Sequence, residues 1–396
     1  MKHSIRYYER VRRFFSFLLR PWFQHMFLLD ETPFPELPER FLLVSNHVIN
    51  IDPLLVMHCT RRYMHFVATE HLFSMGLVSK VICALGDPIP RAQGGNAAAT
   101  VMDILRKLKN EGSVGIAAEG NCTWNGVTAP FLPATGKMAR ASGVPLVTVR
   151  VQGYLASPRW AFTRRKGPVK ISLGGIYQPD ELKKMKPDEI NALIARDIYV
   201  DAYAEQEAHP QRYPGKRLAE GLEHALVLCP RCHGIDCLHS KDDRFTCSCG
   251  FSVRYDEWGY FTEVSESGED GEAPFRTVRD WDAWQKEYLA GLAPEDLPAG
   301  EDSAMQLLRI EEHQRTREAS GLLRFDASGL RLGDRFFPPE EIAGLAIRYK
   351  GIVSFSDREG NFYEILKEKK KVRYHGRKYL LLYQRLKGEF KNDDRN

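Results

Sequence analysis

Short apolar runs alternate with segments of helical periodicity in the first half of the chain. In residues 97–109, for example, Val101, Ile104 and Leu108 recur at the three- and four-residue spacing of an amphipathic helix. This alternation is typical of an α/β domain built on a mainly parallel sheet. The expected strands are residues 41–44, 63–68, 113–117, 146–151 and 169–173, and the expected helices are residues 53–60, 69–84, 96–110, 134–142 and 187–206.

The second half of the chain has a different pattern. A cysteine-rich segment is followed by an acidic Ser/Gly linker at 265–272 and by a second break rich in Pro, Gly and acidic residues at 292–302. Short apolar runs from residue 322 then predict strands, with a helix near residues 379–386 and a basic stretch at 367–373 that fits a solvated strand and turn. Strands closed by a helix resemble a pleckstrin-homology-like barrel. The expected domains are an amphipathic segment (1–30), the α/β domain (31–215), a zinc-ribbon-like module (225–262), an acidic linker with helices (263–320) and a β-rich, barrel-like domain (321–396).

Composition adds limited information. The 396 residues are 43% apolar and 27% charged, which is ordinary for globular protein and enough for more than one domain. The net charge of +4 does not indicate nucleic acid binding. The chain also lacks the basic and aromatic face that nucleic acid needs, so we expect no such partner.

The distribution of charge is more informative at the N-terminus. Residues 1–21 hold six Lys and Arg residues against the single Glu9, with Tyr and Phe residues between them. Arg20 and Pro21 interrupt the segment, so it predicts neither a signal peptide nor a membrane-spanning helix. Basic and aromatic residues together favour a helix in a membrane interface; the alternative is a helix packed on its own domain. We expect a cytoplasmic protein held peripherally on the inner face of the membrane, with phospholipid as a partner.

Five of the eight cysteines fall between residues 229 and 249. Cys229 and Cys232 form one pair and Cys247 and Cys249 a second, a spacing typical of a tetrahedral zinc ribbon. Four thiolates leave no open position, so we expect structural zinc; free cysteines are the alternative. The residues between the pairs that can replace a ligand are His233, Cys237 and His239.

His47 and Asp52 are separated by four residues where an apolar run meets a helix start. Asp52 and Pro53 have the pattern of an N-cap and first helical residue, which places His47 at the carboxyl end of the preceding strand. A neutral imidazole held by a carboxylate can accept a proton from a hydroxyl group. In the alternative interpretation Asp52 only caps its helix and His47 is an ordinary loop residue.

Three further blocks follow in order: a turn ending in Arg91, a Glu-Gly pair at 119–120, and the apolar run 143–149. Together with the His-x4-Asp block they resemble the glycerolphosphate and lysophosphatidic acid acyltransferase family (PlsC-type), over residues 35–205. The blocks read Asn46-His47-x4-Asp52, Gly86-Asp87-Pro88-Ile89-Pro90-Arg91, Ala118-Glu119-Gly120-Asn121 and Gly143-Val144-Pro145-Leu146-Val147-Thr148-Val149.

The resemblance implies a mixed sheet flanked by helices and an acyl transfer reaction. The acyl group would pass from acyl carrier protein or CoA to a lysophospholipid hydroxyl, converting 1-acylglycerol 3-phosphate to phosphatidic acid. His47 would be the general base and Asp52 its orienting carboxylate. Arg91 would bind phosphate, and Glu119 with Gly120 would form the acceptor site, although an internal salt bridge is an alternative for Glu119.

One departure from the family pattern concerns the acceptor. The family continues Glu-Gly with Thr-Arg or Thr-Lys, whereas this chain has Asn121 and Cys122, so a second phosphate-contacting cation is missing. Lys137, which we include among the substrate-binding residues, or Arg140 can substitute for it. The alternatives are another lysolipid or a lipid amine as acceptor, or a catalytically inactive membrane-associated scaffold.

Overall fold

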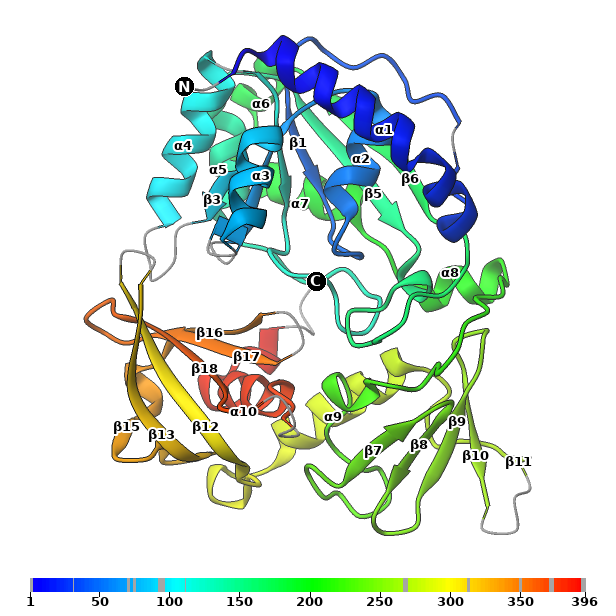
Figure 1. Cartoon of the computed structure of the whole chain (residues 1–396), viewed down its shortest axis with the longest axis vertical. Coiled ribbons are helices and arrows are strands. Elements are labelled where there is room, and N and C mark those ends of the chain that lie inside the picture. The colour runs from blue at the N-terminus through cyan, green and yellow to red at the C-terminus, as the bar shows by residue number, and fades with distance from the viewer. Residues whose placement is uncertain are drawn as a thin grey trace. The chain divides into compact units, whose positions relative to one another are not determined.

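The computed structural model contains two compact units, coloured by residue number in Figure 1. The first unit comprises residues 1–159 and 164–214, and the second comprises residues 160–163 and 215–396. The structure describes residues 3–30, 32–69, 72–73, 76–91, 97–110, 112–265, 270–311, 314–348, 351–369 and 374–392. Part of the expected basic stretch, residues 370–373, lies outside these ranges.

A six-stranded sheet forms the centre of the first unit, in the order β3-β2-β4-β1-β5-β6. Neighbouring strands are parallel except β5 and β6, which are antiparallel, so the expected mixed α/β fold is confirmed. The strand expected at residues 41–44 is observed at Leu42–Ser45 as β1, which is fully buried and lies between β4 and β5. The strands are β1 (Leu42–Ser45), β2 (His65–Thr69), β3 (Ile89–Arg91), β4 (Val114–Ala117), β5 (Leu146–Gln152) and β6 (Lys170–Tyr177).

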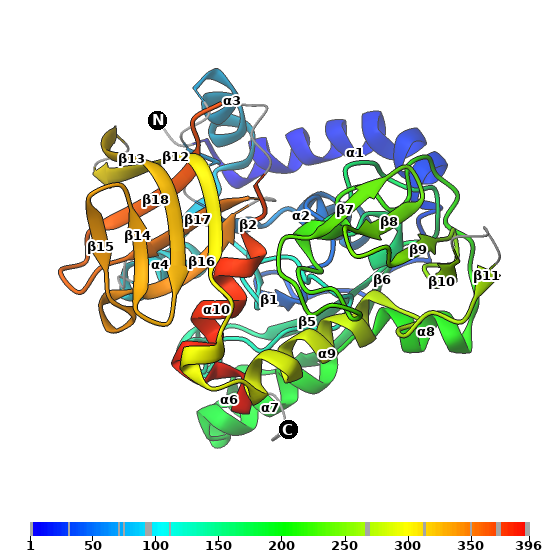
Figure 2. The ribbon, with the colours of Figure 1, turned by 90° about the horizontal axis from the view of Figure 1, so that it is seen from below.

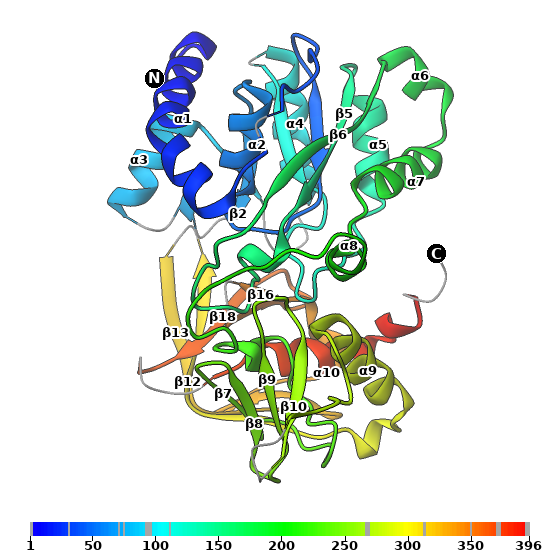
Figure 3. The same ribbon diagram turned by 90° about the vertical axis from the view of Figure 1, so that its right-hand side faces the viewer.

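Helices flank this sheet on both sides, as Figure 3 shows. Apolar residues of α4, α5 and α7 form one core with the strands, while α1 contacts α2 and α3. Residues 187–206 were expected to form one helix, but this is wrong: α7 ends at Ile198, and the Asp201 side chain caps α8 by accepting the N–H groups of Tyr203 and Ala204. The helices are α1 (Ile5–Phe27), α2 (Asp52–Thr60), α3 (Leu77–Gly86), α4 (Ala97–Asn110), α5 (Ala134–Ala141), α6 (Pro179–Lys184), α7 (Pro187–Ile198) and α8 (Ala202–Ala208).

Helix α1 both packs on its own domain and exposes apolar side chains. Phe23 and Phe27 are buried, at 1% and 0% exposure. On the other side Phe14, Phe17 and Leu18 are 61%, 82% and 57% exposed. Within the described residues, no helix combines the length and apolar character needed to cross a membrane.

The second unit contains two antiparallel sheets, shown in Figure 2. A five-stranded sheet, in the order β11-β10-β9-β8-β7, contains Cys247 at the end of β8. A seven-stranded sheet of order β15-β14-β13-β12-β18-β17-β16 packs with α10, which confirms the β-rich C-terminal domain and its terminal helix. Its elements are β7 (Leu238–Lys241), β8 (Arg244–Cys247), β9 (Ser252–Tyr255), β10 (Phe261–Val264), β11 (Asp270–Gly271), α9 (Val278–Gly291), β12 (Gly300–Glu311), β13 (Gln314–Asp326), β14 (Gly329–Leu332), β15 (Arg335–Phe337), β16 (Ala343–Arg348), β17 (Ile352–Ser356), β18 (Phe362–Lys367) and α10 (Arg377–Lys387).

The C-terminal sheet begins earlier than the sequence pattern indicates. Residues 263–320 were expected to be linker and helices, but β12 and most of β13 fall in this segment. The alternation of buried and exposed residues in β12 is hidden in the sequence, because charged and small residues occupy the start of the strand, from Gly300 to Ala304. The buried residues Met305 and Leu307 come only after them.

Candidate active site and metal centre

The backbone of His47 is fixed on both sides at the carboxyl end of β1. The Asn46 side chain forms two hydrogen bonds with the backbone of Val151 in β5, of 2.8 and 2.7 Å. The His47 N–H donates to Glu119 Oε1 at 2.6 Å, and the His47 carbonyl accepts the Thr123 N–H at 2.9 Å. The loop after β4 therefore holds His47 in place, at the edge of the sheet where α/β proteins bind ligands.

The structure brings His47 and Asp52 into direct contact. His47 Nδ1 lies 2.9 Å from Asp52 Oδ2, and the two side chains are 19% and 2% exposed. The N-cap of α2 is Ile51, so the expected capping role of Asp52 is wrong. Its carboxylate turns back to the loop and accepts the N–H groups of Val48 and Ile49, at 2.7 and 3.1 Å. With Nδ1 held in this way, Nε2 is the ring atom left to exchange a proton with a ligand.

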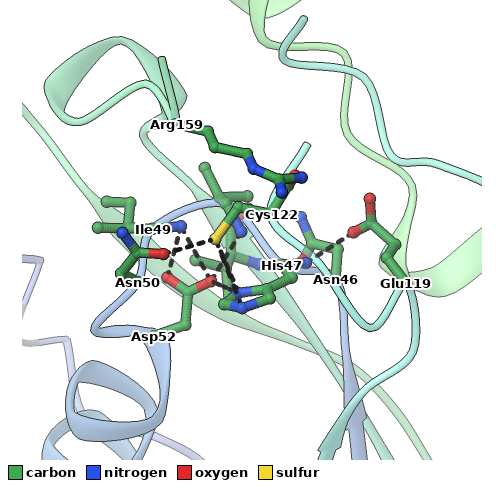
Figure 4. A network of polar contacts seen from close by, with 10 residues as sticks. Asn46, His47, Ile49, Asn50, Asp52, Glu119, Cys122 and Arg159 are labelled. Atoms are coloured by element: carbon green, nitrogen blue, oxygen red, sulfur yellow. Dashed lines mark hydrogen bonds and ion pairs between the residues drawn. The ribbon is translucent and has the colours of Figure 1, made fainter. Parts of the chain in front are cut away.

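Cys122 covers one face of the His47 imidazole, as the close view in Figure 4 shows. Its sulfur lies 3.5 Å from Nδ1 and 3.4 Å from Nε2, and nearly equal distances place the sulfur over the ring instead of along an N–H direction. The thiol donates to Asn50 Oδ1 at 3.3 Å. Burial alone lowers the pKa of His47, but the negative charge that Cys122 can carry and the contact with Asp52 outweigh burial and raise this pKa well above 6.5.

Glu119 uses both carboxylate oxygens to bind the backbone. Oε1 accepts the His47 N–H, and Oε2 accepts the N–H of Ala129 at 2.7 Å. Burial raises the pKa of Glu119 to about 7, against the opposing effect of these two hydrogen bonds. Glu119 therefore links two loops beside the imidazole.

Arg91 reaches the same loop from β3. Its Nη1 donates to the Gly120 carbonyl at 3.1 Å, and burial lowers the pKa of the guanidinium. Gly120 has a φ of +71°, and a Cβ atom there would approach Arg91 Nη1 to 2.2 Å. The turn before β3 is anchored by Asp87, which forms an ion pair with the buried Lys107 side chain and lies 3.4 Å from Nδ1 of the buried His65 ring. The expected Glu-Gly pair and Arg91 are thus in contact with one another.

The other expected substrate-binding residue does not join this group. Lys137 is exposed on α5, and in the part of the chain that the structure describes no hydrogen bond or ion pair connects it to His47, Arg91 or Glu119. Arg140 on the same helix is also exposed and donates to the carbonyl of Lys183 at 3.2 Å. The role of Lys137 in binding the acceptor stays a prediction.

Sequence reasoning missed Arg159 altogether. This residue follows β5 and donates from Nη1 to the Cys122 carbonyl at 2.9 Å, with its guanidinium 3.8 Å from the centre of the Trp124 ring. The two partners lie in the loop after β4, far from Arg159 in sequence, and no local pattern marks such a pairing. Cys122 itself was visible in the sequence only as a departure from the family pattern.

The four cysteines expected to bind zinc lie together in the second unit. The sulfurs of Cys229, Cys232, Cys247 and Cys249 are within 4.8 Å of one another. The pairs 229–249 and 232–247 are 3.8 and 3.7 Å apart. A tetrahedral ion with bonds of about 2.3 Å to sulfur separates its ligands by about 3.8 Å, so this donor set can hold a metal ion.

The residues considered as replacement ligands make other contacts. The Cys237 thiol donates to the Gly234 carbonyl at 3.1 Å. The His233 ring lies against Tyr288, with centroids 4.6 Å apart. Of the described residues, the metal-binding group contains only the four paired cysteines.

Part of the chain matches the model of a known protein family. Residues 30–152 match the family model described as Acyltransferase. The match spans all four sequence blocks and confirms the resemblance drawn from them. Among solved structures, the chain is similar to the 1-acyl-sn-glycerophosphate (LPA) acyltransferase PlsC from Thermotoga maritima, with 17% identity, a TM-score of 0.42, and coverage of 52% of this chain and 81% of that chain. No curated protein sequence matches the chain significantly.

Proposed function

We propose a specific reaction for the acyltransferase domain that this chain carries in residues 30–152. The protein transfers a fatty acyl group from the thioester of CoA or acyl carrier protein to the hydroxyl of a lysophospholipid. The acceptor is 1-acylglycerol 3-phosphate and the product is phosphatidic acid. The observation that carries the proposal is the 2.9 Å contact between His47 Nδ1 and a buried Asp52 carboxylate, with the Nε2 edge left for a substrate.

The geometry supports direct transfer without a covalent acyl-enzyme. His47 Nε2 accepts the proton of the acceptor hydroxyl while the hydroxyl oxygen attacks the thioester carbonyl. His47 then gives this proton to the thiolate that leaves. Asp52 orients the ring and stabilises the imidazolium that forms. Cys122 is not placed to act as nucleophile, because its sulfur lies over the ring face and not along an N–H direction.

The remaining site residues hold the acceptor and the loop in this proposal. Arg91 binds the phosphate through the planar fork of its guanidinium. Gly120 leaves room for Arg91, and Glu119 fixes the loop through its two backbone hydrogen bonds. Lys137 remains a candidate for a more distant contact with the headgroup.

Two further assignments complete the proposal. Structural zinc is bound by Cys229, Cys232, Cys247 and Cys249, because four thiolates at tetrahedral spacing leave no open position for catalysis. The exposed aromatic and basic face of α1 holds the protein on the cytoplasmic face of a membrane, where lysophospholipid acceptors reside.

The test supplies labelled acyl-CoA and acyl carrier protein thioesters with a panel of acceptors and identifies the lipid product by mass spectrometry. The panel contains lysophosphatidic acid, a neutral lysolipid and a long-chain lipid amine. Replacement of His47 by Ala is expected to lower the rate about 10²- to 10⁴-fold, the usual contribution of a general base. The matched control is His209→Ala, an exposed histidine of the same unit.

Each outcome of this assay has a distinct meaning. An unchanged rate in His47→Ala would remove the proposed base. Acylation of the amine or of the neutral lysolipid alone would assign a different acceptor. A folded protein that acylates none of the three would favour the inactive scaffold.

A further inference from the structure

The turn that leads to Arg91 rests on a buried ion pair. Lys107 in α4 is 3% exposed, and its ammonium group pairs with the carboxylate of Asp87, the C-cap residue of α3. Asp87 has a φ of +35°, a left-handed conformation that a residue other than glycine keeps only where its surroundings hold it. The ion pair therefore joins α4 to the end of α3, at the residue where the chain turns toward β3.

Side chains from two other segments hold the same turn. The Tyr63 hydroxyl donates to the Gly86 carbonyl at 2.7 Å. His65 Nδ1 lies 3.0 Å from the Asp87 carbonyl oxygen and 3.1 Å from the Tyr63 hydroxyl. Tyr8 of α1 stacks on the Tyr63 ring, with centroids 5.1 Å apart. The position of the turn is thus set by α4, by α1 and by the segment that begins β2.

The connection from Asp87 to Arg91 is short and stiff. It consists of Pro88, Ile89 and Pro90, and the two proline rings restrict the backbone of their own residues. Ile89 is 1% exposed and pairs with β2, so the middle of the connection is held in the core. A displacement of Asp87 therefore has little room to be absorbed within this segment and reaches Arg91.

The guanidinium of Arg91 has little freedom at its other end. Nη1 donates to the Gly120 carbonyl at 3.1 Å, and a Cβ atom added at Gly120 would approach Nη1 to 2.2 Å. Recognition of a phosphate by a guanidinium depends on the orientation of its planar fork. A small shift of β3 would therefore change which N–H groups Arg91 can offer to a ligand.

We propose that Lys107 and Asp87 are positioning residues for phosphate recognition by Arg91. Lys107 is buried, so it acts on the acceptor only through the turn and β3. This inference rests on the proposed function, in which Arg91 binds the phosphate of the acceptor. It deepens that function, because it assigns part of the affinity for phosphate to a residue of α4 outside the four sequence blocks.

The test is a double-mutant cycle on the full chain. Binding of lysophosphatidic acid and of monoacylglycerol with the same acyl chain is measured in mixed micelles without an acyl donor, and kcat and KM are measured separately. Lys107→Met should weaken lysophosphatidic acid binding about 10- to 100-fold, the range for a charged hydrogen bond, and leave kcat and monoacylglycerol binding unchanged. In Arg91→Gln this loss is already present, and adding Lys107→Met should not increase it. Arg106→Met, an exposed residue of α4 that pairs with Asp103, is the matched control and should change neither value.

A loss of the same size in the Arg91→Gln protein and in the wild type would overturn the proposal, since Lys107 would then support the fold without acting through Arg91. Unchanged affinity in Lys107→Met, equal losses for both acceptors, or a wild type without preference for the phosphate would overturn it as well.

A second variant covers the case in which Lys107→Met does not fold, as judged by thermal unfolding. Tyr63→Phe removes only the hydroxyl that donates to Gly86, and it should weaken lysophosphatidic acid binding about 2- to 10-fold, again only while Arg91 is present. The same cycle then decides. A wild type that prefers the phosphate but acylates neither acceptor contradicts the proposed function, while the binding cycle still tests the positioning role.

Discussion

The surroundings of the His47 imidazole determine when it can act as a base. Its pKa is raised well above 6.5, because Cys122 and Asp52 together outweigh the effect of burial. A general base must be neutral, so kcat/KM should rise with pH along a limb centred above pH 6.5. Replacing Cys122 by Ser removes the ionisable thiol over the ring and should move this limb to lower pH. The measurement is the pH profile of kcat/KM for both proteins.

The control for this comparison is Cys83→Ser, a cysteine on α3 with no contact to His47 among the described interactions. A limb that stays in place, or moves to higher pH, in Cys122→Ser would show that the sulfur does not raise the pKa of His47.

Gly120 allows a separate test of the Arg91 contact. In Gly120→Ala the new Cβ atom would approach Arg91 Nη1 to 2.2 Å, whereas Gly143 has a similar φ of +67° and nothing within 4 Å. Both substitutions should cost about 1 to 2 kcal/mol of stability from left-handed backbone strain. Only Gly120→Ala should also lower kcat/KM for a phosphate-bearing acceptor, by about 10- to 100-fold, because it displaces a charged hydrogen-bond donor. Thermal unfolding and steady-state kinetics of the two variants separate the effects.

Activity losses of equal size in Gly120→Ala and Gly143→Ala would mean that Arg91 is not used in binding.

A local sequence pattern can predict only those site residues that lie close together in the sequence. His47 and Asp52 are neighbours in sequence, so a motif predicts them. Arg159 meets Cys122 only because β5 and the loop after β4 end at the same edge of the sheet, and no local pattern contains that information.

At the scale of elements, buried strands were the most predictable feature. Strand β1 has four buried residues in a row, and only a central strand of a parallel sheet is buried on both faces in this way. Prediction failed where local chemistry interrupts a pattern. The cap at Asp201 divides one expected helix in two, and the polar start of β12 conceals a strand whose partners β13 and β18 lie on either side of it.

Helix α1 carries a prediction about membranes. Its exposed positions include the basic residues Arg10 and Arg13 beside the large apolar residues Phe14, Phe17 and Leu18. Replacing these three apolar residues by Ser should weaken binding to anionic phospholipid vesicles at least about tenfold, since burial of one such side chain is worth about 1.5 to 3 kcal/mol. The measurement is co-sedimentation with vesicles at low and high salt.

The control for α1 is Met102→Ser on α4, which removes an apolar side chain that is 65% exposed elsewhere in the same unit. Vesicle binding that falls equally in this control, or that persists in the triple variant, would rule out a membrane-binding role for the exposed face of α1.

At the scale of the whole molecule, the cysteine cluster is tied to the rest of its unit by buried charges. Lys378 on α10 is 1% exposed and forms ion pairs with Asp236, next to Cys237, and with Asp302 in β12. The neighbouring Arg377 pairs with Asp282 of α9 at 3.2 Å. A buried cation that loses a partner is strongly destabilising. The loop that contains Asp236 therefore connects the metal centre to the seven-stranded sheet.

Removal of the metal should therefore destabilise the whole second unit and not only the zinc-ribbon-like module. Cys232→Ser, or treatment of the wild type with a strong chelator, should remove the zinc and lower the unfolding temperature of this unit by at least about 6 °C, which corresponds to about 2 kcal/mol for a unit of this size. Cys237→Ser is the matched control, because this thiol donates to the Gly234 carbonyl and lies outside the four-sulfur group, so it should keep its zinc. Zinc content by mass spectrometry and calorimetry on the full chain measure both effects. If zinc is retained in Cys232→Ser but lost in Cys237→Ser, Cys237 and not Cys232 is the fourth ligand. If zinc is lost without any change in the unfolding temperature, the Asp236 loop keeps its ion pair with Lys378 without the metal.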